Sequence, residues 1–199
     1  MHGSFSRTVF SLSIAETDCS RDYWATREWV SPAAQADIRS SAIIAVPWEN
    51  FRDGEKALFP QGTADVIALV RKAFNDKEIA VGIDREFYKE IALHGREWRL
   101  PTFLVTAVLV PALVQVLGNR IDNALFSPTE KDSVEVELIV EGSRGRCMSL
   151  KYKGPPSRLI ETLTNETKNC FPDELKGQPY ENEKRRIGRK PHKTRKVTS

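Results

Sequence analysis

The sequence predicts an α+β protein: a single domain with a mixed sheet packed by a long buried helix, followed by a disordered basic C-terminal tail. Three observations predict this class. Residues 134–140 and 145–154 alternate apolar with charged residues, which is typical of two paired strands. Residues 100–120 are the most apolar stretch of the chain and supply a helix to cover the sheet. The end of the chain is cationic and has too few large apolar side chains to offset the entropy of ordering.

The size of the chain sets the domain boundaries. A length of 199 residues with 40% hydrophobic residues suits one compact domain with an added tail. We place the α+β domain over residues 4–172 and the tail over residues 173–199. The three cysteines, Cys19, Cys147 and Cys170, lie far apart without a CxxC pair, which is typical of free thiols in a reducing compartment. The amino terminus makes a poor signal peptide, so we expect a cytoplasmic protein, or a nuclear one if the source is eukaryotic.

Short strands and helices are expected in the first part of the chain. Phe10, Leu12 and Ile14 alternate with serines and predict a half-buried strand. One or two helical turns are expected over residues 22–30, and Pro32 can open a further helix. The continuous apolar run 42–45 predicts a buried strand.

The middle of the chain predicts a helix followed by a strand. Thr63 is a plausible N-cap for a helix over residues 63–74, where apolar residues repeat at helical spacing. Residues 78–84 predict a short strand, and residues 86–101 are expected as its hairpin partner, with a helix over 87–93 as the alternative.

The clearest hairpin in the chain joins the two alternating segments through the turn 142–145. Glutamates on its first strand and lysines on its second can pair across the solvent-facing side. After the hairpin, Pro156 fits the first turn of a final helix that should end near Phe171.

The apolar stretch allows two interpretations. Residues 102–118 carry no charge over about 17 positions, which is at the short limit for a membrane-spanning helix. However, Leu117, Ile121 and Leu125 continue the apolar pattern at four-residue spacing while polar residues take the other faces. We therefore favour a helix packed on the sheet and keep a single span at 102–118, and with it a membrane-associated component, as the alternative.

Candidate catalytic residues lack a diagnostic motif. A hydrolase would use His94 with Asp84 or Glu86, or Cys147 with His94. A metal-dependent nuclease would draw on Asp132, Glu141 and Lys151. In each case a structural or solvated role is favoured, and no catalytic residue, cofactor or metal is predicted.

The loop 142–146, GSRGR, offers glycines and arginines that could hold a phosphate. Two glycines that supply turn conformations explain it better. Two tryptophan-bearing segments, residues 22–29 and 46–54, could anchor a protein partner, although tryptophan is more often buried.

The cationic tail is the one feature of the sequence that points to a function. From residue 184 onward the chain carries Lys and Arg and no acid, so the rest of the chain has more acids than bases. Such a segment attracts an extended polyanion by charge. The sequence therefore predicts a non-catalytic binding or adaptor protein, with a folded domain for a protein partner and a tail for nucleic acid or another polyanion. The predicted binding residues are Lys184, Arg185, Arg186, Arg189, Lys190, Lys193, Arg195 and Lys196.

Overall fold

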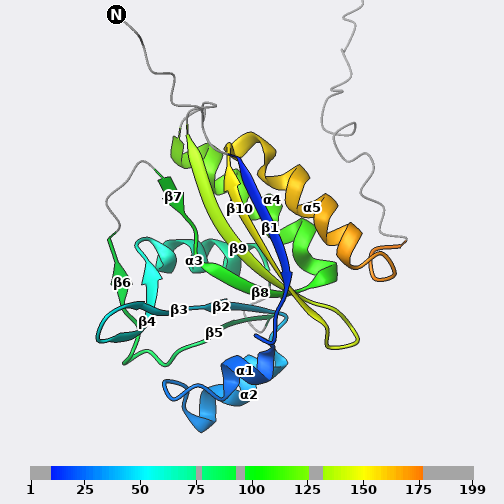
Figure 1. Cartoon of the computed structure of the whole chain (residues 1–199). Coiled ribbons are helices and arrows are strands. Elements are labelled where there is room, and N and C mark those ends of the chain that lie inside the picture. The colour runs from blue at the N-terminus through cyan, green and yellow to red at the C-terminus, as the bar shows by residue number, and fades with distance from the viewer. Residues whose placement is uncertain (1–9, 75–77, 93–96, 126–131, 177–199) are drawn as a thin grey trace, which may run out of the picture.

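The structure is a computed structural model and describes residues 10–74, 78–92, 97–125 and 132–176. Its elements follow one another along the chain (Figure 1). They are β1 (Ser11–Glu16), α1 (Arg21–Ala25), α2 (Pro32–Ser40), β2 (Ile43–Val46), β3 (Trp48–Arg52), β4 (Glu55–Pro60), α3 (Thr63–Ala73), β5 (Ile79–Val81), β6 (Glu90–Ile91), β7 (Glu97–Arg99), β8 (Thr102–Thr106), a 3-10 turn (Ala107–Leu109), α4 (Val110–Leu125), β9 (Ser133–Glu141), β10 (Cys147–Gly154) and α5 (Pro156–Cys170).

The main sheet is mixed, and its strand order is β1-β10-β9-β8-β2-β5, with β7 also paired to β9. The pairs β1–β10, β10–β9 and β2–β8 are antiparallel, whereas β8–β9, β7–β9 and β2–β5 are parallel. In Figure 1, helices α4 and α5 lie behind strands β9 and β10, and helices α1 and α2 lie at the β2–β5 end of the sheet. A smaller sheet contains β3, β4 and β6. The predicted α+β class with a mixed sheet is confirmed.

Several predicted elements are confirmed. The alternating segments form the hairpin β9–β10, the runs at 10–14 and 42–45 overlap strands β1 and β2, and the run at 78–84 contains strand β5. Pro32 opens α2 behind an N-cap at Ser31, whose hydroxyl accepts from the Ala34 amide. Pro156 opens α5, which ends at Cys170.

The apolar stretch is not one helix. Its first part is strand β8, which pairs with β2 and β9, and helix α4 begins only at Val110. Among the described residues, no helix has the length and apolarity needed to cross a membrane. A single helix over 102–118 is not formed, because residues 102–106 pair with β2 and β9 in the sheet. A short apolar run has no periodicity that separates a buried strand from a buried helix.

One strand was not predicted, and two further expectations need correction. Trp48 and Phe51 lie on the strand that was not predicted, β3, which pairs with β4. Helix α3 has Gly62 as its N-cap, and the Thr63 hydroxyl donates to the Pro60 carbonyl at 2.6 Å. The described residues within 86–101, which are 86–92 and 97–101, form neither a hairpin with β5 nor a helix: β6 pairs with β4, and β7 pairs with β9.

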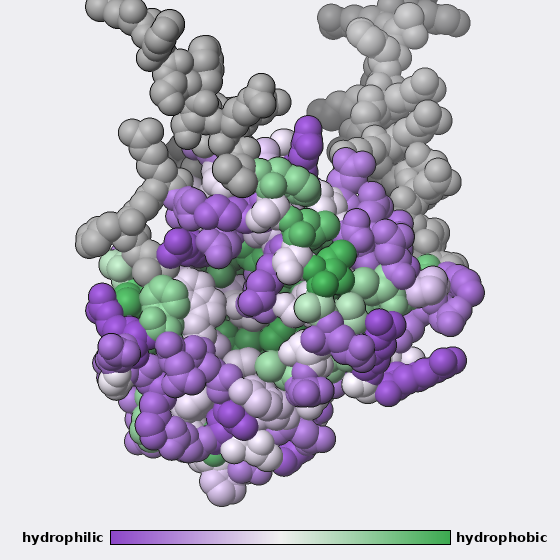
Figure 2. Space-filling model, in the orientation of Figure 1, coloured by the Kyte–Doolittle hydropathy of each residue, from purple (hydrophilic) through white to green (hydrophobic). Residues whose placement is uncertain are grey.

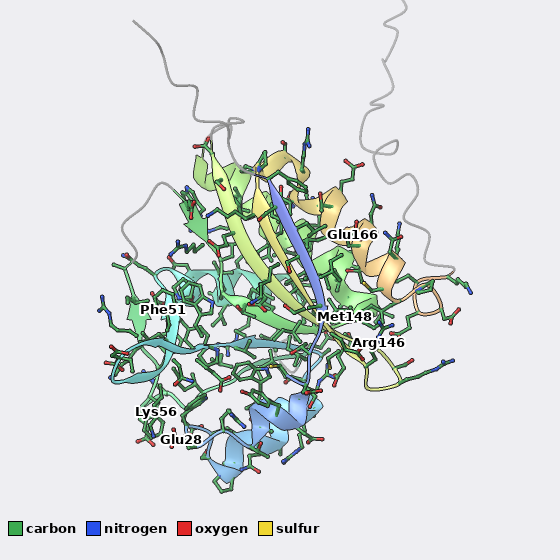
Figure 3. All side chains as sticks on the ribbon, in the orientation of Figure 1. Glu28, Phe51, Lys56, Arg146, Met148 and Glu166 are labelled. Carbon is green, nitrogen blue, oxygen red and sulfur yellow. The ribbon has the colours of Figure 1, made fainter. Side chains whose placement is uncertain are left out.

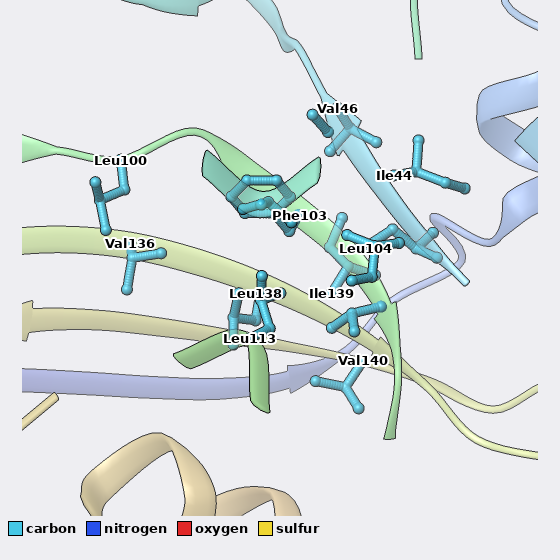
Figure 4. Packing of buried hydrophobic residues seen from close by; sticks show 14 of the residues in the cluster. Ile44, Val46, Leu100, Phe103, Leu104, Leu113, Val136, Leu138, Ile139 and Val140 are labelled. Carbon is cyan, nitrogen blue, oxygen red and sulfur yellow. The ribbon is translucent and has the colours of Figure 1, made fainter. Parts of the chain in front are cut away.

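The core lies between the sheet and helices α3, α4 and α5. Leu113 of α4 packs beside Leu138 of β9, and Phe103 of β8 lies close by (Figure 4). All three side chains are fully buried. Because Leu138 faces the helices, the alternation along β9 directs Glu135 and Glu137 to the opposite face.

Candidate functional site on the open face of the sheet

The face of the sheet opposite α4 and α5 is called the open face. Strand register assigns its residues, because side chains directly opposite each other in paired strands share a face. Lys151 is opposite Glu137 and Ser13, and Arg99 is opposite Glu135. Figure 2 shows a hollow with hydrophobic surface near the middle of the molecule on this side, surrounded by hydrophilic residues.

The charges of the open face are neutralised in pairs. Lys153 Nζ lies 2.7 Å from Glu97, Arg99 Nε lies 3.2 Å from Glu135, and Lys151 Nζ lies 3.4 Å from Glu137. The hydrogen bond from Lys153 is the main reason that the pKa of Glu97 lies below its usual range. The predicted pairing of glutamates and lysines across the hairpin is thus confirmed for Glu137 and Lys151, whereas Glu135 and Lys153 pair with residues of β7.

A cleft of about 360 Å³ lies between this charged surface and strand β3. Trp48 and Phe51 line it on the β3 side, with ring centroids 5.0 Å apart and ring planes inclined by 37°. The Trp48 indole donates to the Thr102 hydroxyl at 3.2 Å, which fixes the ring against β8. Phe51 is 47% exposed and is labelled in Figure 3 on the β3 side of the molecule. The remaining lining residues are Arg99, Leu100, Thr102, Glu135, Val136, Glu137 and Lys151.

The β3 side of the cleft is braced by helix α1. The Tyr23 hydroxyl donates to Glu49 of β3, and Arg27 forms an ion pair with Glu49 at 3.4 Å. The Arg27 guanidinium also lies 3.9 Å from the centroid of the Tyr23 ring. The hydrogen bond to Glu49, followed by burial, raises the pKa of Tyr23 to about 12, so the phenol keeps its proton at neutral pH. Strand β3 is therefore held in place by polar contacts as well as by its pairing with β4.

The hydrolase candidates have other roles where the structure describes them. Asp84 accepts from the Ser31 amide at 2.9 Å and from the Ser31 hydroxyl at 3.2 Å, so it supports the start of α2. Glu86 lines a different cleft of about 410 Å³, where Lys56 forms an ion pair with Glu28 at 2.7 Å (Figure 3). His94 lies outside the described residues.

The nuclease candidates are also engaged where their contacts are given. Glu141 forms a largely buried ion pair with Arg21 of α1, and Lys151 pairs with Glu137. Cys147, the hydrolase candidate that was paired with His94, is buried, and this burial raises the pKa of its thiol. Asp132 precedes β9. Across the described ranges, no group of three His, Cys, Asp or Glu side chains could hold a metal ion.

The GSRGR loop binds a carboxylate of the same chain. The Ser143 amide and hydroxyl donate to Glu174 Oε1 at 2.8 and 3.2 Å. Gly145 has φ +76°, which agrees with the expectation that glycine supplies a turn conformation here. A Cβ on Gly142 would lie 2.7 Å from the Phe171 ring, so this glycine allows the segment after α5 to approach the loop.

The two tryptophan segments differ. Trp24 and Trp29 are buried in the core, as tryptophans usually are, whereas the β3 segment brings Trp48 and Phe51 to the cleft. The sequence indicated this segment as an anchor, but Arg99 and Glu135 were missed as its neighbours because strand pairing, not spacing, brings them there. The eight predicted cations from Lys184 to Lys196 lie outside the described residues.

Fold and site together define an α+β domain with an aromatic-lined cleft on the open face of its sheet. No family model matches the chain, and neither curated proteins nor solved structures yield a match. The case for a function therefore depends on the residues themselves.

Proposed function

We propose that this protein is a non-catalytic binding protein that acts as an adaptor. Its folded domain binds a protein partner at the open-face cleft, and its tail from Lys184 to Lys196 binds nucleic acid or another polyanion. The observation that carries the proposal is the aromatic pair of half-buried Trp48 and exposed Phe51 beside a surface whose charges are already paired.

Aromatic side chains in pockets are the usual centres of protein interfaces, where they contribute area at little cost in side-chain entropy. The paired charges around the cleft make a polar rim that needs no counter-charge from the partner. A volume of about 360 Å³ is enough to receive one or two apolar side chains of a partner segment. We therefore expect recognition of an aromatic or large aliphatic anchor.

The cleft is tested by selecting peptides from a random display library on the full-length chain. The change is Phe51→Ser, and the matched control is Phe87→Ser, because both rings are 47% exposed and Phe87 lines the other cleft. We expect enriched peptides with an apolar anchor whose affinity falls about tenfold on Phe51→Ser, equivalent to about 1.4 kcal/mol, and is unchanged on Phe87→Ser. Equal loss in both variants, or no enrichment, would refute the cleft as the binding site.

The tail is tested with a short labelled DNA duplex of random sequence by fluorescence anisotropy. Replacing the eight tail cations by glutamine in the full-length chain should abolish binding at moderate salt, because these cations would supply the phosphate contacts. Each such contact contributes about 0.9 to the slope of log affinity against log salt. The matched control replaces Arg71 and Lys72, cations in the last turn of α3, by glutamine. If the tail variant binds as well as the unaltered chain, the polyanion role is wrong.

A further inference from the structure

We propose that strand β1 pairs in antiparallel fashion with β1 of a second copy of this chain, so that two sheets join into one. Strand β1 is an edge strand, paired with β10 alone among the described strands. Two apolar side chains at this edge are exposed: Ile14 is 38% exposed, and Phe10, directly before the strand, is 46% exposed. This inference goes beyond the proposed function and does not depend on it.

The hydrogen-bond pattern identifies the free backbone groups of the edge. The Thr17 amide donates to the Cys147 carbonyl at 3.1 Å, so Thr17 directs its backbone groups toward β10. Backbone groups alternate in direction along an antiparallel strand, so Ala15 and Ser13 also bond inward. Leu12, Ile14 and Glu16 therefore direct their N–H and C=O groups outward.

The edge lacks the features that usually prevent pairing. Edge strands of monomeric proteins are protected by lysine, proline, bulges or inward-pointing charges. The sequence of β1, SLSIAE, contains none of these in its interior, and its register with β10 runs without a bulge. Its single charge, Glu16, is at the end of the strand and pairs with Arg146 at 3.8 Å.

The strand is complementary to itself, which is why we assign a second copy as the occupant. A two-fold axis at Ser13 places Leu12 opposite Ile14 of the second copy on the face toward the helices. On the open face it places Ser11 opposite Ala15 of the second copy. Leu12 and Ile14 then exchange backbone hydrogen bonds, Glu16 lies opposite Phe10 of the second copy, and no like charges are opposed.

This pairing has a consequence for the whole molecule. Residues opposite each other in a sheet share a face, so the helices of both copies lie on one side and both open faces on the other. The dimer would present two aromatic clefts on one continuous surface. A partner with two anchor segments would bind such a dimer with higher avidity than a single domain.

The first experiment measures the mass of the full-length chain by light scattering over a concentration series. We expect a dimer whose dissociation constant rises about tenfold or more on Ile14→Lys, which places charge on the edge and changes the binding free energy by about 1.4 kcal/mol. The matched control is Val108→Lys, because Val108 is 40% exposed and lies in the 3-10 turn between β8 and α4.

The second experiment tests the register. Ser13→Cys should form an intermolecular disulfide under mild oxidation, because facing residues of a non-hydrogen-bonded pair have Cα atoms about 4.5 Å apart. Ser11→Cys should not, since Ser11 faces Ala15, and the unaltered chain controls for the three native thiols. A monomer at every concentration, a dimer insensitive to Ile14→Lys, or equal cross-linking of the two cysteine variants would overturn the proposal.

Discussion

Removal of the Arg21 side chain should destabilise the fold more than any other single loss of charge among the ion pairs described. Arg21 ties α1 to the end of β9 through its ion pair with Glu141, and the two side chains are only 17% and 13% exposed. Its guanidinium also donates to the carbonyls of Ser41 at 2.9 Å and Ala42 at 3.4 Å. The guanidinium is poorly solvated in this partly buried position, and this burial lowers the pKa of Arg21.

The magnitude follows from what each substitution leaves unpaired. Arg21→Met leaves the Glu141 carboxylate without its cation and the Ser41 carbonyl without a donor, and breaking a buried pair in this way costs about 3–5 kcal/mol. Glu141→Gln keeps an acceptor beside Arg21 and leaves both carbonyl contacts intact, so we expect a smaller loss of about 1–3 kcal/mol.

The assay is urea unfolding followed by tryptophan fluorescence, with the free energy compared at constant m-value. The matched control is Arg39→Met, because Arg39 and Asp22 form an exposed ion pair at 2.9 Å that should contribute less than about 1 kcal/mol. If Arg21→Met proves too unstable to purify, the comparison of Glu141→Gln with the control Arg39→Met still tests the argument. A cost below about 1 kcal/mol for both Arg21→Met and Glu141→Gln would refute the reasoning.

Two further predictions concern helix packing and acid stability. Gly118→Ala should destabilise the protein by about 1–2 kcal/mol in urea unfolding, because the new methyl group would lie 2.7 Å from Ile160 Cδ1 and 2.9 Å from Ile160 Cγ1. In an Ile160→Ala background, which lacks both atoms, the same substitution should cost much less. Burial raises the pKa of Glu90, but hydrogen bonds from Tyr88 and from the Ala64 and Gly62 amides outweigh this effect, so the pKa of Glu90 lies below its usual range. The stabilising effect of this carboxylate is therefore complete above the ordinary pKa of a glutamate and is lost as the pH falls through the lowered folded-state pKa. In an acid titration of stability, the difference in unfolding free energy between the unaltered chain and Glu90→Gln should shrink as the pH falls through that range. A difference that stays constant with pH would contradict the prediction.

Elements whose apolar residues recur at a regular spacing could be predicted from the sequence. An element that is apolar throughout could not. The hairpin β9–β10 alternates over its length, and α5 combines a proline start with a clear apolar face. Residues 102–106 are uniformly apolar, so nothing in their pattern separates a buried strand from a helix. Strand β3 could not be predicted for another reason. Its sequence, WENFR, is largely polar, and the strand pairs with β4 in an irregular register.

The candidate site could be predicted only in part, because its two sides come from distant parts of the sequence. The β3 segment drew attention through its aromatic residues alone. Its neighbours Arg99 and Glu135 lie about 50 and 85 residues further along, and they meet through the parallel pairing of β7 with β9. Parallel pairing has no local sequence signal, since the connection between the strands is long.

The two proposed binding modes should respond to salt in opposite ways, and this separates them in one experiment. The cationic tail has no acids among its residues 184–199, so its attraction to a polyanion depends on counterion release and falls steeply as salt rises. On the open face, Lys153, Arg99 and Lys151 are already paired with glutamates, so an apolar anchor in the cleft gains little from long-range charge. Its affinity should stay constant or rise slightly with salt, because salts that are excluded from protein surfaces strengthen apolar burial. A partner whose binding falls with salt as steeply as that of DNA would therefore be held by the tail, even if it contains an aromatic anchor.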